Sequence, residues 1–197
     1  ELWIYPRSYT TFQTLIQRGT SGNGFQVGWT DDAVDGYVAC FIGTGTWSDT
    51  LARAQSYPLN TWHHIGCTYD GANIRLYVDG TLTNATAKTG TMTTFENMTI
   101  GGTFSATQIF NGTMDEIALW NISLSSGEIA KHAGYGIDLS MYGNNATEIQ
   151  NARINATFGK FGESMQFTGR NAAPFDFINI SNSSSMDSFN KTGQITV

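Results

Sequence analysis

The strongest constraint on the fold is a succession of short apolar or alternating runs, each bounded by glycine, asparagine or aspartate. These runs cover 12–19, 24–29, 36–43, 61–71, 73–83, 96–102 and 112–121, and then 161–169, 175–181 and 193–197. Runs of this length between turn residues are typical of strands. Asp70-Gly71 and Asp79-Gly80 are the clearest turn signals, because such pairs accept the positive φ of tight turns. The sequence therefore predicts an all-β protein.

One stretch favours a helix. Ser125 and Glu128 have the spacing of a capping box, and Ile129 follows where it can dock on a sheet. We expect a short, peripheral helix of about one turn ending near His132.

Composition excludes several classes of protein. Charged residues make up only 13% of the 197 residues, with 10 Lys+Arg against 16 Asp+Glu and no basic cluster, so we expect no nucleic-acid partner. The chain has no run of 18 apolar residues, so we expect no membrane insertion. The length and the 40% apolar content favour one large domain. Few charges with abundant glycine, serine and threonine are typical of an extracellular or cell-surface module.

The two cysteines, Cys40 and Cys67, each lie in an apolar, strand-like stretch. They could form a disulfide between neighbouring strands of an exported protein, or they could be two small buried apolar side chains. The sequence leaves both readings open. Zinc is disfavoured, because the two cysteines and three histidines show no ligand spacing.

Asparagines are unusually often followed by Ser or Thr two residues later. Fifteen asparagines and 41 serines and threonines in 197 residues would give about three Asn-x-Ser/Thr triplets by chance, and the chain has nine. They begin at Asn84, Asn97, Asn111, Asn121, Asn145, Asn155, Asn179, Asn182 and Asn190. The excess predicts N-glycosylation, although asparagine and threonine also serve turns and strand faces in β proteins.

Two long stretches carry a family resemblance. "WHHIGCTYDGANIRLYVDG" at 62–80 and "FNGTMDEIALWNISLSSGEI" at 110–129 resemble the middle and end of the laminin G-like jelly-roll family of the concanavalin A-like superfamily. The stretches at 138–147, 159–169 and 177–180 resemble the beginning of that family. The resemblance implies an antiparallel two-sheet jelly-roll sandwich with one short helix.

The resemblance runs in rotated order, since the family's opening strands lie at the end of this chain. We expect 1–133 to form the main body of a sandwich and 134–197 to supply its opening strands. A body made of 1–133 alone would leave long strand edges unpaired, which soluble β proteins avoid. The segment 134–197 could complete the next copy by strand complementation or tandem repetition, or it could fold back on its own chain; we favour the first.

The two ends of the sequence predict one continuous strand. Reading the last residues into the first gives alternating faces, with Ile195, Val197, Leu2 and Ile4 on one and Thr196, Glu1, Trp3 and Tyr5 on the other. Both ends look like halves of a strand interrupted in the middle, which indicates one period of a repeat. The predicted seam between units consists of Ile195, Thr196, Val197, Glu1, Leu2, Trp3 and Ile4.

Catalysis is not expected. The glucanases that share this fold carry closely spaced carboxylates on one face of a strand. Here Asp115 and Glu116 are adjacent on a strand and so face opposite sides; we expect Asp115 to bind loop amides instead. His63 and His64 are expected to be hydrogen-bonded strand residues.

Calcium and external glycans are the alternative ligands. Many relatives hold Ca²⁺ near the sandwich rim, and the acidic side chains that could do so here are Asp31, Asp32, Asp35 and Asp176. A solvated acidic loop explains the same residues. Trp29, Trp47, Tyr57 and Trp120 could bind a glycan, although aromatic side chains more often fill sandwich cores.

Taken together, these patterns predict a non-enzymatic, N-glycosylated structural unit of an extracellular filament or cell-surface array, with copies of itself as partners and no certain cofactor. The dense sequons hint at an archaeal surface. A calcium-assisted, lectin-like adhesion module is the alternative function.

Overall fold

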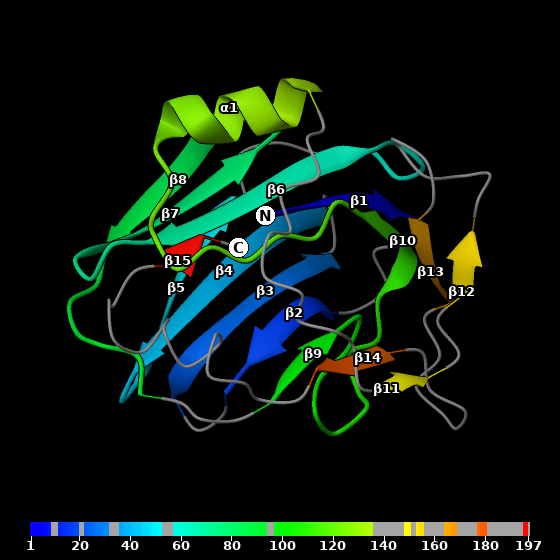
Figure 1. The fold of residues 1–197 in the computed structure, drawn as a ribbon, viewed down its shortest axis with the longest axis horizontal. Helices are drawn as coiled ribbons and strands as arrows, with labels where there is room; N and C mark the ends of the chain where they lie inside the picture. The colour runs from blue at the N-terminus through cyan, green and yellow to red at the C-terminus, as the bar shows by residue number, and fades with distance from the viewer. Residues whose placement is uncertain are drawn as a thin grey trace.

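A computed structural model describes residues 1–8, 12–19, 22–31, 36–52, 57–93, 97–135, 148–150, 153–155, 164–168, 177–180 and 195–196. Within them the strands form two antiparallel sheets, A and B, and one helix lies outside sheet A (Figure 1). The predicted all-β sandwich is therefore confirmed.

Sheet A has the spatial order β12-β13-β10-β1-β6-β7-β8, and β15 also pairs with β6. Its strands are β1 (Leu2–Pro6), β6 (His63–Tyr69), β7 (Asn73–Val78), β8 (Thr81–Ala87), β10 (Asn111–Asp115), β12 (Arg153–Asn155), β13 (Ser164–Thr168) and β15 (Ile195–Thr196). The predicted turn between β7 and β8 is a tight hairpin, in which Asp79 and Gly80 have φ values of 50° and 73°.

Sheet B has the spatial order β11-β14-β9-β2-β3-β4-β5. Its strands are β2 (Gln13–Arg18), β3 (Asn23–Asp31), β4 (Gly36–Thr44), β5 (Trp47–Ala52), β9 (Met98–Ile100), β11 (Glu148–Gln150) and β14 (Phe177–Ile180). β5, β11 and β12 were not expected from the sequence. β5 (WSDTLA) is too mixed to give a clear signal, and β11 (EIQ) and β12 (RIN) each hold a single apolar residue.

The core lies between the sheets and is built from the inward residues of both. Trp29 and Phe25 of β3, Tyr69 of β6 and Phe110 before β10 are almost fully buried there. Alternation explains this arrangement, because every second residue of each inner strand faces the other sheet.

The helix α1 (Ser126–Tyr135) is longer than the single turn that the sequence predicts. The predicted capping box is present, since Glu128 N donates to Ser125 Oγ and Ser125 N donates to Glu128 Oε2. Ile129 is fully buried against Gly66 of β6. The helix also packs on the β7–β8 hairpin beyond Ile129. Because Gly80 has no side chain, Ala130 and Ala133 of α1 approach its backbone closely. Across the part of the chain that the structure describes, no helix has the length and apolarity needed to cross a membrane.

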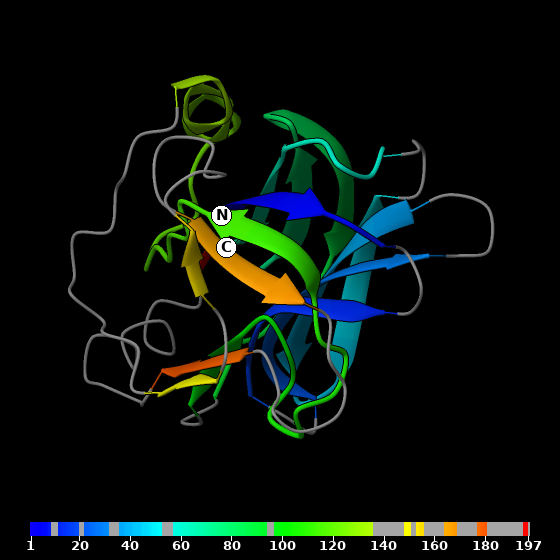
Figure 2. The same cartoon turned by 90° about the vertical axis from the view of Figure 1, so that its right-hand side faces the viewer.

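The described strands after α1 cover edges of the body formed by 1–133. β13 pairs with β10 from Asn111↔Thr168 to Met114↔Met165, and β14 pairs with β9 around Ile178↔Ile100. Figure 2 shows β1, β10 and β13 side by side. In this single chain, therefore, the strands from 134–197 sit on the chain's own body.

Candidate functional site

β15 and β1 lie end to end along the same edge of β6, where Figure 1 draws β15 in red. Thr196 is opposite Thr68, and Leu2 is opposite Ile65. Two residues lie between Thr196 and Leu2 in the joined order, and two lie between Thr68 and Ile65 on β6. Because both gaps are equal, one ladder register runs through β15 and β1, and we call this pair the composite strand.

The register fixes which face each position of the composite strand occupies. Leu2 and Ile4 are fully buried in the core between the sheets. Trp3 lies on the opposite face, with its ring 5.3 Å from that of His64. Ile195 and Thr196 stand at positions in phase with this alternation, and Val197 lies outside the described residues.

Glu1 occupies the position of an interior strand residue. Its backbone exchanges two hydrogen bonds of 2.9 Å with Ala118, one in each direction. Glu116, with φ of 50°, adds an extra residue between β10 and this pair, so the ladder continues through a bulge.

The Glu1 side chain connects the composite strand to α1. Its Oε1 accepts hydrogen bonds from His132 Nδ1 at 2.6 Å and from Trp120 Nε1 at 3.1 Å. The rings of Trp120 and His132 stack on each other, 5.8 Å apart. Its Oε2 lies 3.6 Å from His64 Nε2, which is beyond hydrogen-bond length, and it attracts this ring only when the ring is protonated. A carboxylate that is only 3% exposed thus lies against three side chains.

This environment changes the ionisation of Glu1 and His64. Burial raises the pKa of the Glu1 carboxyl, but the nearby His64, the α-amino group and His132 outweigh it and lower that pKa to about 2. Burial lowers the pKa of His64, which Glu1 partly offsets. Glu1 is therefore a carboxylate throughout the physiological pH range.

The Glu1 pKa predicts acid sensitivity. Because the carboxyl titrates near 4.5 when unfolded and at about 2 when folded, it contributes about 3 kcal/mol above pH 4.5, which is lost as the pH falls from 4.5 to 2. We expect Glu1→Gln to be less stable than the wild type at pH 7 and to approach it at pH 2 to 3, measured by urea unfolding. A constant difference between the two proteins across this range would contradict this account.

His63 lies on the inner face and connects the sheets. Its ring nitrogens contact Asp79 Oδ2 at 3.1 Å and the Pro58 carbonyl at 3.0 Å. The ring stacks on that of Trp29 from sheet B and meets Tyr57 edge-on. Asp79 also accepts the His64 backbone N–H, so the hairpin aspartate fixes the start of β6. His63 is a hydrogen-bonded strand residue as expected, whereas the His64 ring has no hydrogen bond within the described residues and only the His64 backbone N–H is bonded to a side chain. Trp29 and Tyr57 are core residues.

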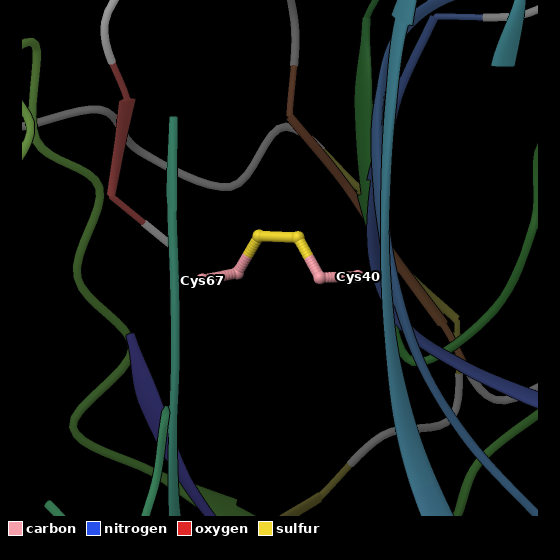
Figure 3. The surroundings of a disulfide bond; sticks show 2 residues. All are labelled: Cys40 and Cys67. Carbon is pink, nitrogen blue, oxygen red and sulfur yellow. A yellow bond between two sulfur atoms is a disulfide. The ribbon is translucent and has the colours of Figure 1, made fainter. Parts of the chain in front are cut away.

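The structure joins Cys40 of β4 to Cys67 of β6 in a disulfide (Figure 3). The Cα atoms are 6.1 Å apart, and the bond crosses from one sheet to the other. Both residues are fully buried. Cys67 lies opposite the gap between β15 and β1, so the disulfide fixes β6 where the composite strand joins.

The acidic residues predicted for calcium are mostly outside the described residues. Asp31 ends β3, where its side chain is not described, and Asp32, Asp35 and Asp176 lie outside the described ranges. Within those ranges no three His, Cys, Asp or Glu side chains form a group that could hold a metal ion. Asp115 Oδ1 accepts the Glu116 N–H at 2.9 Å, so it serves the loop amide as expected.

The structure gives the accessibility of four of the nine sequon asparagines. Asn84 and Asn97 are exposed, whereas Asn111 and Asn121 are half-buried, and Asn111 Nδ2 donates to Ser8 Oγ at 3.2 Å. Asn155 and Asn179 belong to β12 and β14, where side chains are not described. Asn145, Asn182 and Asn190 lie outside the described residues. Among the described side chains, Asn84 and Asn97 are thus the best acceptors for a glycan.

A polar and aromatic cluster on the outer face of sheet B was missed in the sequence. Gln26 Nε2 donates to Thr14 Oγ1 at 2.7 Å and to Gln108 Oε1 at 3.1 Å. Beside them Phe12 packs edge-on to Phe41 and covers Gly28. The half-buried rings and amides come from β3, β4 and two loops, and Gln108 itself has a positive φ of 53°. No local motif signals such a cluster, because only sheet pairing brings these residues together.

Trp120 and Trp47 are the remaining aromatic residues that the sequence proposes for glycan binding. Trp120 is half-buried and hydrogen-bonded to Glu1, and Trp47 lies in β5, where its side chain is not described. Trp120 therefore packs against His132 and Glu1 and does not belong to the cluster with Gln26.

Comparisons with known proteins agree with this geometry. Residues 1–130 match a laminin G family described as the concanavalin A-like lectin/glucanases superfamily. The fold is similar to domain 4 of AbnA, a GH43 extracellular arabinanase from Geobacillus stearothermophilus, solved in complex with arabinotriose. That match has a TM-score of 0.51 and 18% sequence identity, and it covers 67% of this chain and 64% of that one, which is less than two thirds of its length. No curated protein matches the chain.

Proposed function

The chain belongs to the concanavalin A-like lectin/glucanase superfamily, and we propose that it is a cohesive unit of an extracellular filament or cell-surface array. In this proposal, strands from 134–197 of one copy complete the 1–133 body of the next copy. Its partners are further copies of the same chain and its own covalent N-glycans. The proposal assigns the unit no enzymatic activity.

The observation that carries the proposal is the single register of β15 and β1 on β6. A strand that arrives from a neighbouring copy would meet the same edge of β6 with the same alternation. The contacts that seat β13 on β10 and β14 on β9 are equally available to strands of another copy. Exchange of identical elements is a common route to assemblies, because every contact is already compatible.

Cysteine pairing tests whether strands pass between copies. Thr113 of β10 and Gln166 of β13 are opposite each other, on strands that do not carry the native disulfide. Chains with Thr113→Cys alone and chains with Gln166→Cys alone are mixed, refolded at high concentration and oxidised. We expect disulfide-linked dimers in the mixture and a ladder of covalent multimers from chains with both substitutions. If the doubly substituted chain gives only an internal disulfide in a compact monomer, the exchange between copies is wrong.

Carbohydrate binding is the second candidate function, and the cluster on the outer face of sheet B favours it. Phe12 and Phe41 offer aromatic surface, while Gln26 and Gln108 offer amides that can bind sugar hydroxyls. The AbnA domain of similar fold was solved with arabinotriose. Calcium, if it assists, would be held by the predicted aspartates.

Titration with arabinotriose tests this second function. We expect Phe41→Ala and Gln26→Ala each to weaken binding by about tenfold, equivalent to ~1.4 kcal/mol, because each removes a direct contact. Trp120→Phe, which alters a residue under α1, is the control and is expected to bind as the wild type does. A chelator added to the wild type shows whether calcium takes part. Binding that is unchanged in both cluster variants would exclude this cluster as the sugar site.

A further inference from the structure

β8 is the outermost described strand of sheet A. It pairs with β7 and with no other described strand. All seven residues of β8 are exposed or half-buried, and the Leu82 side chain is 48% exposed. An edge strand of this length that pairs with a described strand on one side only is a template for pairing with other chains.

The sequence of β8 lacks the usual protection of such an edge. Its residues, TLTNATA, include no lysine, arginine or proline. The structure shows two partial protections. The register of β8 shifts between Leu76 and Tyr77 of β7, which leaves Thr83 as an extra, bulged residue. Next to it, Asn84 Oδ1 accepts the Ala85 N–H at 2.8 Å, so one backbone donor is already bound locally.

Asn84 begins the triplet Asn84-Ala85-Thr86 and is exposed at the bulge. We propose that an N-glycan on Asn84 covers the outer edge of β8 and prevents sheet A from pairing there. This inference rests on the proposed N-glycosylation of the unit and adds a role to one particular site. The nearby bulge and the exposure of β8 leave room for a bulky substituent.

The chemistry requires a lipid-phosphate-linked oligosaccharide and its transferase. Asn84 Nδ2 attacks the anomeric carbon of the first sugar and loses one proton, which passes to a base of the transferase. A carbon–nitrogen bond forms, and the bond between the anomeric carbon and the phosphate oxygen breaks, so the lipid phosphate leaves with the electron pair. The product keeps Oδ1, which can still accept the Ala85 N–H.

Covering the outer edge of β8 restricts which strand edges can join one copy to the next. In the proposed array, growth uses the edge of β6 that receives β15, together with the edges of β10 and β9. Uncontrolled pairing of other chains with β8 would compete with this strand complementation. A hydrated glycan on Asn84 would leave strand complementation as the remaining route between copies.

The test is expression in a host that performs N-glycosylation, followed by light scattering during gel filtration and glycopeptide mass spectrometry. Thr86→Ala removes the triplet but keeps the Asn84 side chain. Thr99→Ala would disturb a buried hydroxyl, so Asn97→Gln is the matched control, because Asn97 is exposed but precedes the inner strand β9.

We expect Asn84 to be occupied in the wild type. Thr86→Ala should lose one glycan and give a severalfold larger share of high-mass aggregate, whereas Asn97→Gln should lose one glycan without that rise. An unmodified Asn84, or aggregation that is equal in both variants, overturns the proposal. The cysteine-pairing test uses unglycosylated chains, so its outcome is separate from this one.

Discussion

Loss of the Cys40–Cys67 bond is expected to lower the free energy of unfolding by about 3.5 kcal/mol. The bond closes a loop with a sequence separation of 27 residues, and a cross-link of this span restricts the unfolded chain by roughly that amount. Both cysteines are fully buried, so Cys40→Ala with Cys67→Ala also leaves small gaps that add to the loss. The measurement is the urea midpoint of the double variant against that of the wild type.

A reductant provides the internal control for this prediction. Reduced wild type should lose nearly as much stability as the double variant, whereas the double variant should not respond to the reductant. Equal urea midpoints for the oxidised wild type and the double variant would mean that the cysteines act only as small apolar residues, which is the other reading that the sequence leaves open.

Much of the fold could be predicted because its signals are local. The Asp79-Gly80 pair predicts the β7–β8 hairpin, since both residues take positive φ. The capping box predicts where α1 begins. The end of α1 was predicted too early, because the helix continues through a tertiary contact with Gly80 that no helix-stop signal reveals.

The surroundings of Glu1 could not be predicted in this way. Its partners His132, Trp120 and His64 are 63 to 131 positions away in the sequence and come from other elements. A glutamate beside apolar strand residues normally indicates a solvent-facing position. Here α1 covers that face, so the same alternation places Glu1 beneath a helix.

Asp79 shows how one residue can satisfy a local and a distant requirement. The sequence predicts it as a turn residue, and the hairpin agrees. Its carboxylate additionally binds His63 and the His64 N–H. Burial raises the pKa of Asp79, but these partners outweigh it and lower that pKa. The pairing of β6 with β7 determines this second role, and pairing is not encoded in a short motif.

The composite strand predicts that the chain can be circularly permuted without loss of stability. In a permuted chain, residues 136–197 come first, Val197 is joined directly to Glu1, and the chain ends at Tyr135, so that α1 stays whole. The peptide bond would replace the buried α-amino group of Glu1, whose pKa burial lowers to about 5. Because an amine with that pKa opposes folding by about 1 kcal/mol at pH 7, we expect the permuted chain to be at least as stable as the present one.

Insertions at the Val197–Glu1 junction measure the register itself. One inserted residue would move the side chains of β15 to the opposite faces of the sheet, because Leu2 and Ile4 keep β1 in place in the core. We expect this change to lower the free energy of unfolding by about 2 to 3 kcal/mol. Two inserted residues restore the alternation and should lower the free energy of unfolding by less than one inserted residue does. The residue inserted is threonine in both cases, so that chain length and phase are the only variables.

The most direct measurement is the urea unfolding of three permuted chains, with no, one and two threonines between Val197 and Glu1. If β15 and β1 form one strand on β6, the chain without an insertion is the most stable, the chain with two follows, and the chain with one is the least stable. Three equal midpoints would contradict the composite strand, because they would show that β15 and β1 hold no common register.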